Sequence, residues 1–414
     1  MAPMRGTVLW VCSLMLLGGC VTVARRAPPP STISQAEPVG YASRVRLVTT
    51  DLAGFTHGAP AFLQGLRRAA AGRRIRILAL SGGGSNAAFG AGALVGLSEA
   101  HARPRFELVT GVSAGAIIAP FAFLGPAWDA QLQAAIADSR GHPPVGSLVW
   151  RMMVLLMAPL GWRGHDPLLD FVDRQITPAM LRAIAREDAK GRRLIVATTD
   201  LDSQQTVLWD MGAIAARGGK RALELFRKVI VASASVPGVF PPVLISVRDG
   251  THRYEELHVD GGVTAPLFIF PVAAVLRPQD LAPLRGAEVD VIVNGKLAAV
   301  PTETSVNTIE VLSRSLSVEV ISRTRAAIVE LLDMARQLDM QLRMTEIPPG
   351  FPFGTGFDFG PRHTQALFSY GERCAAQGRL WMTPTQAGRL NMKAPPIDTV
   401  EPWPCPPDAL TQDR

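Results

Sequence analysis

From Ile75 onward, short apolar segments with strand-like composition alternate with segments that have a helical pattern. Such alternation predicts a mostly parallel sheet, because each helix carries the chain back across one face of the sheet. We therefore expect a three-layer α/β/α fold with a mostly parallel central sheet. The strand-like segments are IRILAL (75–80), FELVTG (106–111), RRLIVATTDL (192–201) and VDVIVNGK (289–296).

Composition limits the classes of partner and cofactor. The chain has 414 residues, of which 48% are hydrophobic, and this is enough for a sizeable core. Its net charge of +7 fits an anionic partner, but we favour the simpler interpretation of an arginine-rich, solvated surface. The sequence contains neither metal-ligand spacing nor a basic patch interleaved with aromatic residues. We therefore expect no metal, no organic cofactor and no nucleic acid.

The N-terminus is typical of an export signal. MAPMR (1–5) precedes an apolar run over residues 6–19, which is too short for a comfortable membrane span. The run ends in Leu-Gly-Gly-Cys20, which resembles a bacterial lipobox. This resemblance implies cleavage before Cys20, a lipid attached to that cysteine and, with Thr22 in place of aspartate, sorting to the outer membrane. An uncleaved anchor and a plain signal peptide stay open as alternatives.

The rest of the chain divides by composition. Pro, Ser and Ala dominate the segment after the signal, which we interpret as a tether, and proline recurs in a tail that we expect to be irregular. The predicted parts are a signal peptide (1–20), a Pro/Ser-rich tether (21–40), a lead-in segment (41–74), the main domain (75–380) and a Pro-rich C-terminal tail (381–414).

The motif Gly-x-Ser-x-Gly occurs at residues 111–115, with Ser113 at its centre. FELVTG before it predicts a strand, and AGAIIAPFAFLG after it predicts a buried helix that Pro120 kinks or shortens. A serine on such a strand-to-helix turn has the geometry of a nucleophile elbow. The alternative is an ordinary small residue in a tight turn.

A second glycine-rich segment, SGGGSNAAFGAG (81–92), follows the first predicted strand. It leaves backbone N–H groups uncovered at the start of a helix, where the helix dipole favours an anion. In acyl transfer that anion is the tetrahedral oxyanion. The predicted oxyanion donors are the amides of Gly82, Gly83, Gly84 and Ser85.

The same loop also matches the dinucleotide-binding fingerprint through Gly82, Gly84 and Ala87. That fold needs an acidic residue about 20 residues further on, at the end of its second strand. Glu107 lies at the start of the second strand instead, and the serine motif occupies its end. We therefore favour the oxyanion interpretation.

Asp260 ends the strand-like segment ELHVDGGV (256–263) and is followed by two glycines. Functional groups collect at strand ends of a parallel sheet, so Asp260 is a candidate base for Ser113. A plain Asp-Gly turn is the structural alternative. His363 is the other candidate base, because it fits the order serine, acid, histidine of α/β hydrolases.

The order SGGGSNAAFGAG, TGVSAGA and VDGG resembles the patatin-like phospholipase family, in particular its bacterial lipoprotein members. The resemblance covers roughly residues 75–380. It implies a catalytic dyad of Ser113 and Asp260 without a histidine, with the glycine loop as oxyanion hole. The loop departs from the family at Asn86 and Ala87, where many members have a basic residue and a glycine. This departure bears on phospholipid preference more than on hydrolysis.

The family resemblance implies a serine acyl hydrolase that cleaves acyl esters of phospholipids or lysophospholipids at the bacterial envelope. Membrane lipid is the expected substrate, and a lipid anchor on Cys20 is the expected link to the membrane. The sequence does not predict an oligomeric state. A general carboxylesterase and a non-catalytic envelope protein on the same scaffold are the alternatives.

Two apolar segments and two cysteines have further structural implications. SLVWRMMVLLMAPLGW (147–162) is either a lid or acyl-chain wall, or a core helix, since methionine adapts to both settings. Residues 306–344 predict one or two amphipathic helices packed on the domain. Cys374 and Cys405 are the pair that remains after signal cleavage, and they can form a disulfide in an oxidising compartment.

Overall fold

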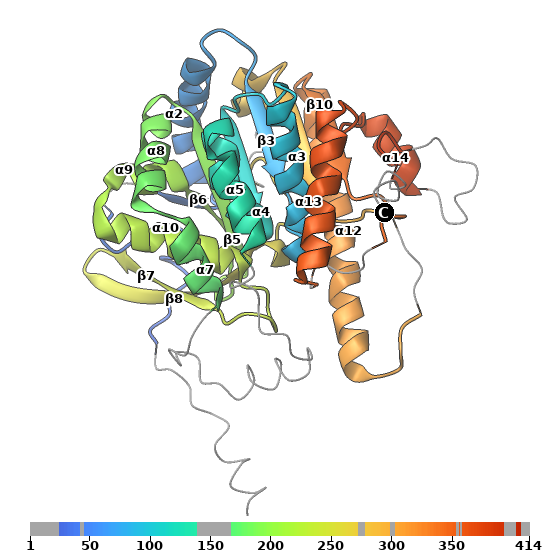
Figure 1. Cartoon of the computed structure of the whole chain (residues 1–414). Coiled ribbons are helices and arrows are strands. Elements are labelled where there is room, and N and C mark those ends of the chain that lie inside the picture. Colours follow the sequence, from blue (N-terminus) through green and yellow to red (C-terminus); the bar gives the residue numbers. More distant parts are fainter. Residues whose placement is uncertain are drawn as a thin grey trace, which may run out of the picture.

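The computed structural model describes residues 25–41, 45–138, 167–271, 278–298, 303–352, 356, 358–392 and 403–406. A ten-stranded sheet lies between two layers of helices (Figure 1). Its centre consists of parallel strands in the order β5-β4-β3-β9-β10, so the predicted α/β/α fold is confirmed. These strands are β5 (Arg193–Asp200), β4 (Leu108–Val112), β3 (Arg76–Leu80), β9 (Glu288–Val293) and β10 (Gln341–Glu346).

Antiparallel strands extend the sheet beyond β5. Strands β8 and β7 form a hairpin that continues to the short β1, and β6 pairs with both β5 and β2. The sequence analysis recognised β8 as a strand but expected it to run parallel. Strand direction depends on the partner strand, which the strand's own residues do not encode. These strands are β8 (His252–Asp260), β7 (Val243–Asp249), β1 (Glu37–Pro38), β6 (Gln205–Asp210) and β2 (Arg46–Val48).

Alternate residues of the central strands face two separate cores. In β3, Leu78 and Leu80 face one helical layer, whereas Ile77 and Ala79 face the other. The first layer contains α3 (Ala87–Glu99), α4 (Ala114–Leu124), α5 (Asp129–Ala137), α7 (Pro167–Gln175), α8 (Pro178–Ala189), α9 (Met211–Arg217), α10 (Gly219–Ala234) and α13 (Pro361–Ala376). The second contains α2 (Leu52–Ala70) and α12 (Thr308–Gln337), with α14 (Pro384–Met392) beside them.

Strands β4 and β8 meet end to end on the same edge of β5. Strand β4 pairs in parallel with β5 up to Val112 opposite Ala197, and β8 pairs antiparallel with β5 from Asp260 opposite Thr198. Strand β6 pairs with β5 along both stretches and therefore occupies the opposite edge. The carboxyl ends of β4 and β8 consequently lie next to each other, although the two strands run in opposite directions.

A buried polar network fixes β8 beside β5. The His258 ring is hydrogen-bonded to Thr198 Oγ1 through Nδ1 at 3.0 Å and to the Glu256 carboxylate through Nε2 at 3.1 Å. Arg46 of β2 pairs with the same carboxylate, and Trp209 Nε1 donates to Thr198 Oγ1 at 2.8 Å. Breaking such a network would leave a buried charge without compensation, so the end of β8 is held in one register.

The segment expected to be a tether (21–40) is ordered from Arg25 onward. Arg25 donates two hydrogen bonds of 2.5 Å to the Asp202 carboxylate, and β1 pairs with β7. The described part of this segment therefore belongs to the domain, because its polar groups find partners on the sheet that composition does not reveal. The part before Arg25, which includes the predicted signal peptide and Cys20, lies outside the described residues.

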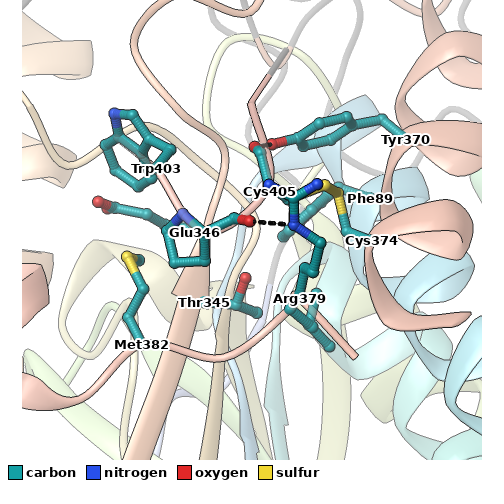
Figure 2. A pocket seen from close by; sticks show the side chains of 11 residues that line it. Phe89, Thr345, Glu346, Tyr370, Cys374, Arg379, Met382, Trp403 and Cys405 are labelled. Atoms are coloured by element: carbon teal, nitrogen blue, oxygen red, sulfur yellow. Dashed lines mark hydrogen bonds between the residues drawn. A yellow bond between two sulfur atoms is a disulfide. The ribbon is translucent and has the colours of Figure 1, made fainter. Parts of the chain in front are cut away.

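A disulfide between Cys374 and Cys405 ties the C-terminal segment to α13, with the two Cα atoms 5.7 Å apart. Beside it, the Tyr370 hydroxyl donates to the Cys405 carbonyl at 2.6 Å, and Arg379 Nε donates to the Pro404 carbonyl at 2.7 Å (Figure 2). The pocket in Figure 2 is lined by none of the predicted site residues. The tail (381–414) was expected to be irregular, but it contains α14 (Pro384–Met392) and is tied to the domain at Cys405.

Helix α12 packs on the sheet along only part of its length. Ile328, Leu331 and Ala335 enter the second core, whereas Leu312 and Leu316 are exposed. The expectation of packed helices over residues 306–344 is therefore correct for the C-terminal half of α12 alone, and it is wrong for residues 341–344, which belong to β10. Among the described helices, none combines the length and apolarity that a membrane crossing needs. The apolar segment 147–162 lies outside the described residues.

Candidate active site

Ser113 lies at the turn between β4 and α4, with φ 56° and ψ −132°. A positive φ costs a residue with a side chain about 1 to 3 kcal/mol, and it persists only where the surroundings enforce it. The flanking glycines permit the turn. A Cβ on Gly111 would lie 2.7 Å from the Gly115 carbonyl oxygen, and a Cβ on Gly115 would lie 2.5 Å from the Ser81 carbonyl oxygen. The local sequence therefore folds into a sharp strand-to-helix turn with Ser113 at its apex.

Ser113 and Asp260, 147 residues apart, are joined by a hydrogen bond in which Ser113 Oγ donates to Asp260 Oδ2 at 2.6 Å. The two residues are only 6% and 4% exposed. Their contact follows from the end-to-end meeting of β4 and β8 on β5. Parallel strands were expected to bring the two residues together, but β8 runs antiparallel to β5 and brings Asp260 to Ser113 from the opposite direction.

The two glycines after Asp260 have separate roles. A Cβ on Gly261 would lie 2.3 Å from the Ala197 carbonyl oxygen and 2.7 Å from Val112 Cγ2, so only glycine lets the two strand ends approach. The Gly262 amide donates to Asp260 Oδ1 at 2.6 Å. Each carboxylate oxygen of Asp260 therefore has one hydrogen-bond donor, which fixes the orientation of the carboxylate toward the serine.

Burial raises the pKa of Asp260 to about 7. Hydrogen bonds from the Ser113 hydroxyl and the Gly262 amide lower the pKa, but they do not offset the loss of solvation. An ordinary aspartate, with a pKa near 4, is a weak base at neutral pH. A carboxylate that titrates near neutrality is a stronger base and is still substantially ionised, which suits general-base catalysis.

We expect activity to depend on one ionisation with a pKa of about 7. Below that pH, kcat/KM should fall about tenfold per pH unit, because a protonated carboxyl cannot accept the serine proton. Above it, kcat/KM should level off. The measurement is kcat/KM for an uncharged ester between about pH 5 and pH 9. A profile that is flat across this range would contradict a base with this pKa.

The glycine loop lies directly beside Ser113, since a Cβ on Gly82 would be 3.0 Å from the Ser113 Cβ. Two of the four predicted oxyanion donors are already engaged. The Gly82 amide donates to the Pro266 carbonyl at 3.1 Å, and the Ser85 amide donates to the Gly356 carbonyl at 2.9 Å. Distant loops thus occupy these two amides, and the predicted set of four is corrected to two.

The amides of Gly83 and Gly84 are the remaining candidates for oxyanion donors. No hydrogen bond from either amide to another described residue is present. Gly84 has φ 57°, and a Cβ on Gly83 would lie 2.0 Å from the Asn294 carbonyl oxygen, so both positions require glycine. The loop beside Ser113 therefore carries two amides at positions where glycine leaves the backbone without a side chain.

Asn294, which the sequence analysis did not single out, holds the loop in place. It is fully buried directly after β9. Its Nδ2 donates to the Ser81 carbonyl at 2.9 Å, its Oδ1 accepts from the Gly90 amide at 3.1 Å, and its own amide donates to Ser81 Oγ at 2.8 Å. One residue thereby links the ends of β3 and β9 to α3. Its sequence signal is a polar residue directly after an apolar strand.

Comparison with known proteins points to the same region. A family model described as patatin-like phospholipase matches residues 78–273, which include the serine turn, the glycine loop and Asp260. Residues 78–273 therefore form a domain of the patatin-like phospholipase family. Membership in this family indicates a lipid-hydrolysing enzyme.

Solved structures that match this patatin-like chain include VipD from Legionella pneumophila and the human GIVD cytosolic phospholipase A2. VipD is 12% identical with a TM-score of 0.31, and the match covers 92% of this chain and 76% of VipD. The human enzyme is 11% identical with a TM-score of 0.32, and the match covers 69% of this chain and 54% of the enzyme. No curated protein matches the chain.

Ser233, on α10 of the patatin-like domain, has a role that its sequence did not predict. It is fully buried, and its Oγ accepts from the Ser113 amide at 3.0 Å and donates to the Ala197 carbonyl at 2.7 Å. The hydroxyl therefore bridges the strained serine turn to β5. Because Ala197 lies beside the point where β4 and β8 meet, Ser233 positions the nucleophile relative to its base.

Replacing Ser233 with alanine should lower the free energy of unfolding by about 1 to 3 kcal/mol, since two buried backbone groups lose their partner. It should also lower kcat by about tenfold or more, because the serine turn is no longer held. Ser235→Ala is the matched control, as Ser235 is the buried C-cap of the same helix and its hydroxyl donates to the Val231 carbonyl. The substitution leaves in place the Ser235 backbone carbonyl, which accepts from the Asp260 amide at 3.0 Å. Equal effects of both substitutions on kcat would contradict a positioning role.

His363, the other candidate base, lies on α13. Its Nε2 is hydrogen-bonded at 3.0 Å to Oδ1 of Asn86, the residue at which the loop departs from the patatin-like pattern. Burial lowers the pKa of His363. The geometry thus associates His363 with the glycine loop, while the Ser113 hydroxyl donates to Asp260. Among the described residues, no group of three or more His, Cys, Asp or Glu could hold a metal ion.

Proposed function

We propose that the chain is a serine acyl hydrolase that cleaves acyl esters of phospholipids or lysophospholipids with a dyad of Ser113 and Asp260. The observation that carries the proposal is the 2.6 Å hydrogen bond between the two buried side chains. It occurs beside a glycine loop in which two amides have no hydrogen-bond partner among the described residues. Together these groups provide a nucleophile, a base and an oxyanion site within one family fold.

In the acylation step, Ser113 Oγ attacks the ester carbonyl while Asp260 Oδ2 accepts the serine proton. The carbonyl oxygen becomes an oxyanion, which the amides of Gly83 and Gly84 stabilise by hydrogen bonds. The proton then passes from Asp260 to the departing alcohol, which is the lysophospholipid or, from a lysophospholipid substrate, the glycerophosphodiester. The acyl group stays on Ser113 as an ester.

In the deacylation step, the same groups act on water. The Asp260 carboxylate takes a proton from a water molecule, whose oxygen attacks the acyl-serine carbonyl. The oxyanion forms again at the glycine loop, and its collapse returns the proton to Ser113 and releases a fatty acid. The Gly262 amide holds the carboxylate oriented through both steps, because it bonds the oxygen that does not face the serine.

The substrate class is tested by fatty-acid release from a panel of esters. Preferential release from phospholipid or lysophospholipid vesicles supports the proposal, whereas activity confined to dissolved short-chain esters indicates a general carboxylesterase. Reaction of Ser113 with a fluorophosphonate reports the nucleophile independently of the substrate. No release and no labelling would favour the non-catalytic scaffold, in which Asn86 replaces the basic loop residue.

We also propose that the chain is anchored at the bacterial cell envelope through a lipid on Cys20. The lipobox-like residues support this location, as does the disulfide between Cys374 and Cys405, because disulfides persist in oxidising compartments. Metabolic labelling with a palmitate analogue should mark the wild-type chain and leave Cys20→Ser unmarked. Equal labelling of both chains, or of neither, would remove the anchor from the proposal.

A further inference from the structure

Helix α12 is much longer than the strand that it follows. It joins β9 to its parallel neighbour β10, so it must run from the carboxyl edge of the sheet back to the amino edge. Its 30 residues extend about 45 Å, whereas the 6 residues of β9 extend about 20 Å. Because its C-terminal end leads directly into β10, the excess length lies beyond the carboxyl edge. Figure 1 shows this N-terminal half projecting from the body of the molecule.

The projecting half of α12, residues 308–323, exposes apolar side chains. Leu312, Leu316 and Val318 are 45%, 48% and 55% exposed, and Thr324 is the first buried residue among the α12 side chains that the structure describes. Leu312 and Leu316 lie one turn apart on one side of the helix, and Val318 lies on the opposite side. An apolar surface on both sides of a projecting helix is unusual for a segment that meets only water.

The N-terminal end of the described chain leaves from the same edge of the sheet. Arg25 is bonded to Asp202, which follows the carboxyl end of β5 by two residues. Cys20 precedes Arg25 by five residues, and five residues reach at most about 18 Å. A lipid on Cys20 would therefore keep the carboxyl edge, with the active site, close to the membrane surface.

We propose that the projecting half of α12 docks into a lipid surface and sets the active-site edge against its acyl-ester substrate. This inference rests on the proposed function for the substrate and the anchor. The short N-terminal link and the projecting helix lie on the same edge of the sheet. A membrane to which the link is anchored would therefore also contact the helix. Lipid headgroups and acyl chains can surround both sides of the helix, whereas a partner helix would cover one side only.

The test is vesicle flotation with a chain that lacks residues 1–20, the predicted signal peptide with Cys20, so that no lipid anchor contributes to binding. The vesicles contain phosphatidylethanolamine and phosphatidylglycerol. Wild type should float with the vesicles, and the double variant L312S/L316S should bind roughly tenfold more weakly or worse, because two apolar side chains no longer enter the lipid.

Val318→Ser and Val329→Ser form a matched pair. Both valines lie on the same side of α12 and are 55% and 65% exposed, but Val329 lies about 16 Å further along the helix, beside the sheet. Val318→Ser should weaken vesicle binding, and Val329→Ser should leave it unchanged. Equal binding by the two variants would overturn the proposal, as would failure of the wild type to float.

Two further readouts separate the alternatives. Gel filtration reports self-association, and conversion of a dimer to a monomer by L312S/L316S without a change in vesicle binding would assign the surface to a second copy of the chain. Hydrolysis of a dissolved short-chain ester should be equal in all variants, because none of the substitutions touches the site. A wild type that binds vesicles through α12 but hydrolyses no ester would refute the proposed function and keep the docking surface.

Discussion

Replacing Ser113 with alanine is expected to abolish fatty-acid release, with kcat at least about 10³-fold below that of the wild type. The alanine side chain has no nucleophile to form the acyl-enzyme, and no other described hydroxyl donates to the Asp260 carboxylate. The measurement is release from phospholipid vesicles and from a short-chain ester, so that a membrane-binding defect is not mistaken for loss of chemistry.

Alanine is a suitable replacement at this position because it keeps the Cβ atom. The strained φ of 56° is therefore retained, and the free energy of unfolding should stay within about 1 kcal/mol of the wild-type value. Circular dichroism and a urea titration serve as the control for folding. Full activity in a folded Ser113→Ala variant, or fluorophosphonate labelling at another residue, would contradict the assignment of the nucleophile.

Asp260→Asn is expected to have the second large effect, a loss of kcat of about 10³-fold or more. The amide keeps the size of the carboxylate and can still accept from the Gly262 amide, but it cannot take the proton of Ser113. His363→Ala is the comparison, and we expect only a modest loss because His363 contacts Asn86 on the loop. Activity that survives Asp260→Asn and disappears in His363→Ala would assign the base to the histidine.

The same substitution should stabilise the fold above neutral pH. Burial raises the folded-state pKa of Asp260 to about 7, so in the wild type stability is lost as the pH rises from the unfolded pKa through the folded one. The full difference from an ordinary aspartate corresponds to about 4 kcal/mol. Asp260→Asn should thus resist urea better than wild type at about pH 8 and similarly at about pH 4. Lower stability at both pH values would show that the carboxylate is needed for packing.

The sequence by itself determined the features that depend on neighbours along the chain. The alternation after Ile75 indicated the layered fold, because hydrophobic periodicity reports which face of each element is buried. The glycines around Ser113 indicated the sharp turn, and the glycine loop indicated open backbone amides, since a missing Cβ acts locally. The family motifs then placed Asp260 with the serine, although the sequence argument assumed the wrong strand direction.

Only the tertiary structure decided the features whose partners lie far away in the chain. Ser113 contacts Asp260 because two strands of opposite direction end at the same point of β5. The residues of one strand alone do not specify which strand it pairs with. Distant carbonyls engage the amides of Gly82 and Ser85, so the number of open donors depends on loops beyond the motif. Ser233 has its role for the same reason, because a buried hydroxyl acquires a function only when folding brings unpaired backbone groups within reach.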